Sequence, residues 1–150
     1  MTRTFKRNLS RRLINGLAAA AIKRGLGPSQ RYLLTVTGRT THSPSTTPVS
    51  VVTDGSARYL VGPYGEVGWV RNARKAGFVT LSRGGSSERF SLMPLDAADA
   101  APVLKRYLEL EPITRPYFGV PPAAPVERFV AEAATHPVFR LTPADTGSRA

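Results

Sequence analysis

The chain has 150 residues, 41% of them hydrophobic, which is enough for one domain with a sizeable buried core. It contains no cysteine, which excludes a disulfide framework, a thiolate metal site and a cysteine nucleophile, and fits a reducing cytosol. The net charge of +11 is concentrated at the amino-terminal end, because the first 53 residues hold nine Lys or Arg and no acid. We therefore expect that end to meet an anionic partner: a lipid surface, a nucleic acid or a phosphorylated cofactor.

Residues 1–27 are predicted to form a basic amphipathic helix. Apolar residues recur every three or four positions and form one stripe, with basic residues on the other faces, and Gly25 and Gly27 end the helix. The apolar run 17–22 is far shorter than the roughly 18 residues that a membrane span needs, and no A-x-A cleavage site follows it. We expect a cytoplasmic protein, with this helix either packed on the domain or bound peripherally to the inner face of an anionic membrane.

Residues 28–142 are predicted to form a mainly β domain with flanking helices (α+β), followed by a flexible tail at 143–150. Asp54-Gly55 and Gly84-Gly85 mark hairpin turns, and a loop with five prolines runs from Pro112 to Pro125. The predicted strands are 32–38, 46–53, 57–61, 78–83, 88–95 and 138–141, and the predicted helices are 68–76, 97–110 and a short one near 126–133. About six strands with few helices indicate a small barrel with helices across its openings.

The turn after the first strand is the first candidate binding segment. It places the guanidinium of Arg39 and the hydroxyl groups of Thr40, Thr41 and Thr46 beside Gly38. Exposed N–H groups and an arginine in such a turn favour an anion. The same composition is also typical of a solvated hairpin turn.

A Gly-rich loop and a basic helix form the second candidate segment. In the loop 62–66, Gly65 permits the close approach of a planar ligand, although the loop also serves as a connector. Trp69 and Asn72 share a face of the helix, where a tryptophan either walls a pocket for a ring or anchors the core. The helix also carries Arg71, Arg74 and Lys75, which either contact a phosphate or are simply solvated.

The late Pro-rich part of the chain is rich in aromatic residues. Tyr107, Tyr117, Phe118 and Phe129 either roof an apolar substrate pocket or pack in the core. The two histidines, His42 and His136, lie far apart without metal-ligand spacing, so no metal site is predicted, and His136 is expected to be structural. No Ser-His-Asp set is persuasively spaced, and Glu109 and Glu111 face apart at a helix end, so hydrolytic chemistry has no candidate.

Two segments resemble the deazaflavin-dependent nitroreductase family. Residues 33–48 are similar to its motif L-x-x-x-G-R-[KR]-[ST]-G-x-x-R-x-x-P, and residues 64–77 are similar to its W-x-x-N-x-x-A-[NG] helix. The segments 115–118 and 136–141 also resemble one branch of the family. The resemblance covers residues 29–142 and implies a six-stranded split β-barrel of the flavin-reductase-like type that binds coenzyme F420.

The resemblance also implies where the cofactor lies. Its phosphate and acidic tail would lie near Arg39, Thr40, Thr41, Thr46 and Pro48, and its ring near Tyr64, Gly65, Trp69 and Asn72. The sequence departs from the motif at Thr40, His42 and Ser45, where the family usually has Lys or Arg, Gly, and Arg. Two phosphate-facing charges are therefore missing, and Arg71, Arg74 and Lys75 are the candidates to replace them.

The function implied is hydride transfer from reduced coenzyme F420 to a quinone, enone or nitroaromatic acceptor. No catalytic side chain is assigned, and the acceptor would lie over the ring, in a pocket formed by Trp69, Tyr117 and Phe118. FMN is the alternative cofactor, and a homodimer is a possible assembly, since such barrels often dimerise. The rival interpretation is a non-catalytic binder of a lipid or another cofactor on the same barrel. Nucleic-acid binding is disfavoured, because no RNA-stacking motif accompanies the charge.

Overall fold

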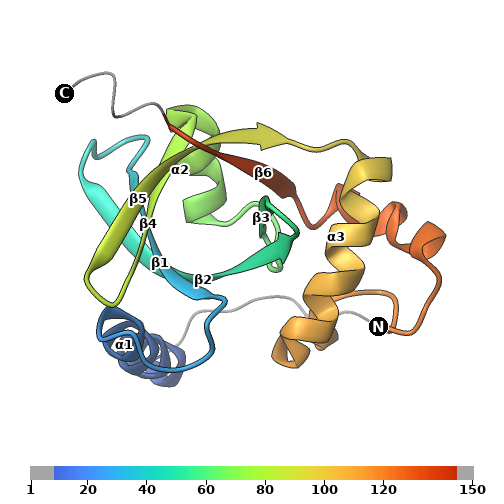
Figure 1. The fold of residues 1–150 in the computed structure, drawn as a ribbon, viewed down its shortest axis with the longest axis horizontal. Helices are drawn as coiled ribbons and strands as arrows, with labels where there is room; N and C mark the ends of the chain where they lie inside the picture. The colour runs from blue at the N-terminus through green and yellow to red at the C-terminus, as the bar shows by residue number, and fades with distance from the viewer. Residues whose placement is uncertain (1–8, 145–150) are drawn as a thin grey trace.

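The computed structural model describes residues 9–144, and for residues 9–15 it describes the backbone alone. Six antiparallel strands close into a barrel in the order β1-β2-β3-β6-β5-β4 (Figure 1). The strands are β1 (Arg31–Thr37), β2 (Pro44–Asp54), β3 (Ala57–Val61), β4 (Phe78–Arg83), β5 (Ser86–Pro94) and β6 (Val138–Pro143). The helices are α1 (Leu9–Lys23), α2 (Gly68–Ala76) and α3 (Ala97–Leu110), with 3-10 turns η1 (Pro112–Tyr117), η2 (Val126–Phe129) and η3 (Ala131–Ala134). The prediction of a six-stranded barrel with flanking helices is confirmed.

Both predicted hairpins are present. In the β2–β3 hairpin Asp54 pairs with Ala57, and in the β4–β5 hairpin Arg83 pairs with Ser86. Gly84 and Gly85 both have positive φ, at 57° and 87°. Two consecutive left-handed residues are what a two-residue hairpin turn requires, and glycine adopts them without steric cost.

Two clusters of buried side chains form the core. One fills the barrel and includes Leu34, Leu60, Phe90 and Phe139, with the buried face of α2 packed against them. The other lies under α3 and the 3-10 turns, which gather on one side of the barrel in Figure 1, and it includes Phe129. The barrel therefore fixes α2, whereas α3 fixes the Pro-rich segment after it.

Several predicted boundaries are wrong. Strand β2 begins at Pro44 rather than at residue 46, because Ser45 and Pro44 still pair with Val36 and Thr37. β5 likewise begins at Ser86 rather than at residue 88. The helix expected near 126–133 consists of η2 and η3, and the Pro-rich loop begins with η1. Pro112 and Pro116 remove backbone donors within η1, whereas η2 and η3 contain no proline and still form only short 3-10 turns.

Helix α1 does not pack through its predicted apolar stripe. Leu17, a residue of that stripe, is 74% exposed, whereas the buried residue Ile22 lies outside the stripe. Five residues of helix separate the two side chains by about 140° around the axis, so one barrel surface does not cover both. The predicted helical residues 1–8 and the tail residues 145–150 lie outside the described residues.

Candidate functional site

The turn between β1 and β2 is tightly folded by its own backbone. Gly38 N–H donates to the Ser43 carbonyl at 2.8 Å, and His42 N–H donates to the Gly38 carbonyl at 3.0 Å. A side chain at Gly38 would collide with Thr41 Oγ1, so the turn requires glycine there. His42 has a φ of 62°, the one positive φ at a non-glycine position within residues 9–144. Histidine tolerates this region better than most residues, but the turn still holds a mild backbone strain.

Arg39 joins this turn to helix α2. Its backbone N–H and its Nη1 both donate to Oδ1 of Asn72, at 3.0 and 2.8 Å. Nη1 also lies 3.5 Å from the carbonyl oxygen of Gly68, in the first turn of α2. Asn72 is 9% exposed, so its amide is a buried anchor for Arg39. The structure thus brings together the two segments that the sequence analysis singled out separately.

The start of α2 lies beside Arg39 and carries no side-chain cap. Val67 occupies the cap position with extended backbone and no capping hydrogen bond, and Gly68 begins the helix on the surface. The first N–H groups of a helix lack partners within the helix, and the macrodipole places partial positive charge there. Arg39 and these N–H groups together make this end of α2 favourable for an anion.

Trp69 is the second residue of α2 and is partly buried. It packs against the cluster inside the barrel while part of it remains accessible. The sequence left open whether Trp69 anchors the core or walls a pocket, and its half-buried position is compatible with both.

The threonines of the turn lie at the surface, as does much of the strand that follows. Thr40, Thr41 and Thr46 are exposed, and Thr46 Oγ1 lies 2.9 Å from Thr35 Oγ1 across the β1–β2 pair. Pro48 is partly buried two residues further along β2, on the same face as Thr46. Thr40 and Thr41 therefore place hydroxyl groups next to Arg39 in the chain, and within the described turn Arg39 is the one permanent positive charge.

The three basic residues of α2 point in different directions. Arg71 and Lys75 are exposed, and Lys75 lies about 60° around the axis from Asn72. Arg74 lies about 160° from Asn72, toward the opposite edge of the helix. Its guanidinium binds Glu66 with two hydrogen bonds of 2.7 and 3.1 Å and lies 5.0 Å above the Phe139 ring. Arg74 does not face the Arg39 edge.

A small pocket lies on the Arg74 side of α2. Its volume is about 210 Å³, and it is lined by Ala73, Arg74, Gly77, Leu92, Pro94 and Phe139. Of the predicted site residues, Arg74 alone borders it. This pocket is therefore separate from the Arg39–Asn72 contact.

The loop 62–66 rests on the late Pro-rich segment. The Tyr64 ring meets the Tyr117 ring edge-on at 4.7 Å, and Gly65 has a positive φ of 85°. Tyr117 and Phe118 are only 7% and 5% exposed and belong to the cluster under α3. Trp69 packs on the other cluster, so the structure does not bring these three predicted pocket residues into one cluster. Tyr64 is the predicted residue that reaches the surface above Tyr117.

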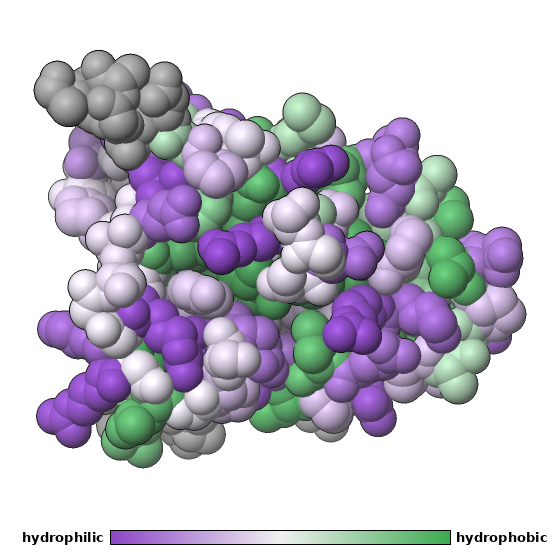
Figure 2. Space-filling view, in the orientation of Figure 1, coloured by the Kyte–Doolittle hydropathy of each residue, from purple (hydrophilic) through white to green (hydrophobic). Residues whose placement is uncertain are grey.

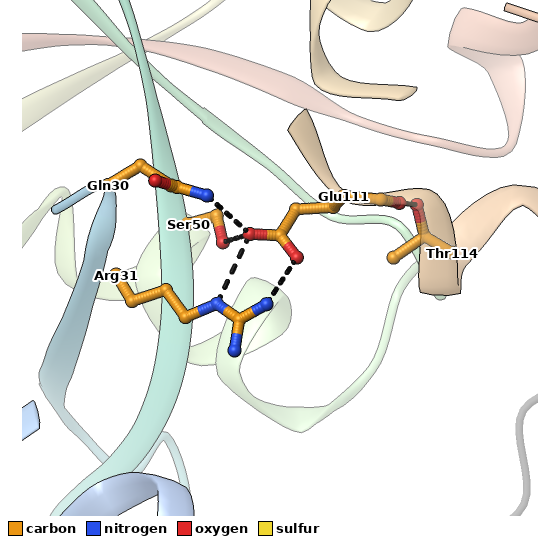
Figure 3. A network of polar contacts seen from close by, with 5 residues as sticks. All are labelled: Gln30, Arg31, Ser50, Glu111 and Thr114. Atoms are coloured by element: carbon orange, nitrogen blue, oxygen red, sulfur yellow. Dashed lines mark hydrogen bonds and ion pairs between the residues drawn. The ribbon is translucent and has the colours of Figure 1, made fainter. Parts of the chain in front are cut away.

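Glu111 is a buried carboxylate that the sequence analysis did not recognise. It lies after α3 and accepts hydrogen bonds from Arg31 Nη2 at 2.8 Å, Ser50 Oγ at 2.6 Å and Gln30 Nε2 at 3.2 Å (Figure 3). Burial raises its pKa, but the hydrogen bonds from Arg31, Ser50 and Gln30 outweigh burial and hold the pKa below its usual value. Its carbonyl also accepts from Thr114 N–H and Oγ1. The network ties α3 and η1 to β1 and β2.

Comparisons with known proteins rest on structure. No protein-family model matches the sequence, and no curated protein matches it. An F420-H2-dependent reductase is similar in structure, with a TM-score of 0.52, 17% identity, and 75% of this chain and 94% of that one covered. A pyridoxamine 5'-phosphate oxidase-like protein from Listeria innocua has a TM-score of 0.50 at 14% identity, covering 77% of this chain and 85% of that one. A domain-swapped dimer has a TM-score of 0.54 at 16% identity, covering 89% and 96%.

The chain has the split-barrel fold. At such low identity the likeness establishes the fold and leaves the activity to the site itself. Within residues 9–144, no group of three or more His, Asp or Glu side chains is placed to hold a metal ion. In the same part of the chain, no helix has the length and apolar character to cross a membrane.

Proposed function

We propose that this split barrel is a deazaflavin-dependent oxidoreductase that transfers a hydride from reduced coenzyme F420 to a quinone, enone or nitroaromatic acceptor. The observation that carries the proposal is the Arg39–Asn72 contact, which joins the hydroxyl-rich turn to the uncapped start of α2. The similarity to an F420-H2-dependent reductase adds support at the level of fold.

The residues at this site fit an anionic, planar cofactor. Arg39 commits Nη1 to Asn72 and Gly68, and its guanidinium has further donors on Nη2 and Nε for a phosphate. Thr40 and Thr41 would add hydroxyl donors, and Lys75 lies on the same side of α2 as Asn72. Near the ring, Gly65 lacks a side chain and Trp69 offers an accessible edge.

In the mechanism we propose, the protein binds, orients and excludes water. Arg39, held by Asn72, fixes the acidic tail, and the half-buried Trp69 and the loop residue Tyr64 orient the ring. Reduced F420, when bound, supplies the two-electron hydride. Tyr117 supports Tyr64 from the core, and Phe118 stacks on His136; because both rings are buried, the acceptor meets Trp69 and Tyr64 rather than these two rings.

Titration of the protein with F420 tests the proposal, with FMN in parallel and the fluorescence of the single tryptophan, Trp69, as the readout. We expect saturable quenching by F420 and weaker quenching by FMN. Tighter binding of FMN would change the cofactor assignment, and no response to either would contradict a flavin-like cofactor.

A non-catalytic binder is the second candidate. The observation that favours it is the turn itself, where Thr40, His42 and Ser45 leave Arg39 as the one permanent charge between Gly38 and Ser45. Binding of reduced F420 without its oxidation by any acceptor would support this alternative.

We also propose peripheral binding of α1 to an anionic membrane. Leu17 and Leu26 are 74% and 57% exposed, beside the basic residues Lys23 and Arg24. Hydrophobic and hydrophilic atoms lie side by side at the lower left of Figure 2, over α1. Deleting residues 1–27 should abolish cosedimentation with anionic vesicles, and binding that persists would refute the proposal.

A homodimer is the assembly we propose, and the domain-swapped dimer among the similar structures supports it. Because the barrel is closed, it offers no free strand edge for pairing. Such a dimer would therefore form through side chains or by exchange of a segment. Light scattering after gel filtration distinguishes a dimer from a monomer.

A further inference from the structure

His136 is a buried histidine outside the predicted site. It lies just before β6 and is 5% exposed. Its imidazole stacks on the ring of Phe118, with 3.9 Å between the centroids and 12° between the planes. The imidazole of His136 is therefore buried away from water and lies flat against the Phe118 ring, in the core under the Pro-rich segment.

The two nitrogens of His136 have unequal surroundings. Nε2 lies 3.4 Å from Oε1 of Glu132 on η3, and the same oxygen accepts the N–H of Gly119 at 3.0 Å. Nδ1 is buried and has no hydrogen-bond partner among the described residues. A neutral imidazole with its proton on Nε2 suits this arrangement, since it donates to Glu132 and places no charge in the stack. A second proton at Nδ1 would bring a buried positive charge.

His136 lies where the loop 62–66 meets the rest of the protein. Gly62 N–H donates to the carbonyl of Pro137 at 2.8 Å. The loop approaches closely enough that a side chain at Gly65 would lie 3.3 Å from the carbonyl oxygen of Thr135. On its other side, Tyr64 packs on Tyr117, the neighbour of the Phe118 that stacks on His136. The loop therefore depends on the segment 135–137 staying in place.

We propose that neutral His136 is a latch that holds the loop 62–66 against residues 135–137, and that protonation of His136 in mild acid releases the loop. The latch bears on cofactor binding only if the proposed function is correct, because it is that proposal which assigns Tyr64 and Gly65 to the ring.

The direction of the pH effect follows from the surroundings of the ring. Burial lowers the pKa of His136, opposed by Glu132 and by nearby carbonyl groups of Pro63, Gly62 and Tyr117. A pKa that is lower in the folded state favours the neutral form, so the stabilisation is complete above the unfolded pKa of about 6.5 and is lost as the pH falls toward the folded pKa. Glu132 is the acidic side chain that faces His136, and the packed segments also carry the phenol groups of Tyr64 and Tyr117.

Hydrogen exchange of the Gly62 amide at pH 7 and pH 5 tests the latch in the ligand-free protein. After correction for intrinsic exchange, we expect Gly62 to lose protection at pH 5 relative to pH 7, because the lowered pKa of His136 in the folded protein makes the closed loop lose stability as the pH falls. The variant His136→Phe keeps a stacking ring but cannot titrate. The difference in Gly62 protection between pH 7 and pH 5, the pH step, should therefore disappear in this variant. Equal protection at both pH values in the natural protein, or a step that persists in His136→Phe, would overturn the proposal.

Two further variants keep the test decisive. His136→Gln, which is also uncharged, replaces His136→Phe if the latter fails to fold, and it should likewise lose the step. His42→Asn removes the other histidine while suiting the positive φ at that position, and the Gly62 step should remain. A step lost in His42→Asn would assign the effect to the turn and contradict the latch.

The exchange readout is independent of the cofactor. A titration with F420 at both pH values, made alongside it, should show weaker binding at pH 5. Absence of binding at either pH would contradict the proposed function, while the exchange of Gly62 would still decide on the latch.

Discussion

At the scale of single residues, the site depends on an amide and a guanidinium. Asn72 Oδ1 accepts from both the backbone and the side chain of Arg39, so the direction of the guanidinium is set by a residue 33 positions away in sequence. A free arginine at a turn would populate several rotamers, and ordering it on binding would weaken affinity. We infer that Asn72 orients Arg39 in advance for an anion.

This inference predicts coupled effects of the two residues. Arg39→Ala should raise the Kd for F420 about tenfold, the equivalent of one charged contact. Asn72→Ala should also raise the Kd, because Arg39 loses the Oδ1 acceptor that orients its guanidinium. The double variant should be little worse than Arg39→Ala alone, since both changes remove one unit. As a control, Arg106→Ala, at an exposed arginine on α3, should leave the Kd unchanged, whereas additive effects would mean that the residues act separately.

Glu111 gives a second prediction at this scale. Glu111→Gln keeps the size of the side chain but removes the charge that Arg31, Ser50 and Gln30 satisfy, so we expect a loss of about 2 kcal/mol at pH 7. Glu109→Gln is the matched control, because that side chain is 51% exposed, and it should change stability by a few tenths of a kcal/mol at most (about 0.3).

The pH dependence has a definite sign, because the folded pKa of Glu111 is lowered from 4.5. Its contribution is present above about pH 4.5 and is lost as the pH falls through the folded pKa. Urea unfolding across acidic pH should therefore show a shallower loss of stability in Glu111→Gln than in the natural protein. Parallel curves for the two proteins would contradict the assignment.

At the scale of elements, one arginine side chain binds the first part of the connection between α1 and β1. The Arg83 guanidinium donates to the carbonyls of Arg31, Gly25 and Gly27 at 2.9, 3.1 and 2.8 Å, and Gly84 N–H donates to the carbonyl of Ile22. Few apolar contacts back this connection, because Ile22 is the buried hydrophobic residue among the side chains described for α1. The docking of α1 therefore depends on the β4–β5 hairpin.

We predict that Arg83→Ala detaches α1 without unfolding the barrel. Trypsin should then cut after Lys23 or Arg24 several times faster than in the natural protein, while the barrel resists. Mass spectrometry of a digestion time course identifies the cut. Arg128→Ala, at an exposed arginine on η2, serves as the control. Equal cleavage rates in both variants would show that the hydrogen bonds of Arg83 do not hold α1.

Elements with strong local signals could be predicted from the sequence. Strand β3 and helices α2 and α3 have the predicted bounds, because turn glycines, an Asp96 cap and helical periodicity are local features. The start of β2 could not be predicted, since Pro44 joins the strand only through its partner Thr37. The single turns η2 and η3 replaced a predicted helix for a similar reason, because their packing under α3 decides their form.

The sequence could indicate individual residues of the candidate site, but it could not predict which of them are in contact. The resemblance singled out Arg39 and Asn72, but only the folded barrel shows that they touch. Helical periodicity alone places Arg74 opposite Asn72, so its separation from that edge was within reach of the sequence. The partners of Glu111 lie 61 to 81 positions away, and local patterns carry no signal for them.

At the scale of the whole molecule, the uneven distribution of positive charge predicts where anionic ligands are attracted. The excess positive charge lies in the first 53 residues, which include the turn with Arg39 and helix α1. An anionic cofactor and an anionic surface would both be attracted to this part of the chain, and the attraction should weaken with salt. We therefore expect the affinity for F420 to fall as ionic strength rises, with a smaller fall in Arg39→Ala, measured by titration at low and high salt. Equal salt dependence in both proteins would mean that the tail binds elsewhere.

The central claim is that the barrel transfers a hydride from reduced F420, and turnover tests it most directly. The purified protein is mixed with reduced F420 and a panel of quinones, enones and nitroaromatics, and the absorbance of the oxidised deazaflavin is followed. We predict oxidation that depends on the enzyme and on at least one acceptor, and that falls sharply in Asn72→Ala and Trp69→Ala. Binding without oxidation by any acceptor, or unchanged turnover in both variants, would contradict the account.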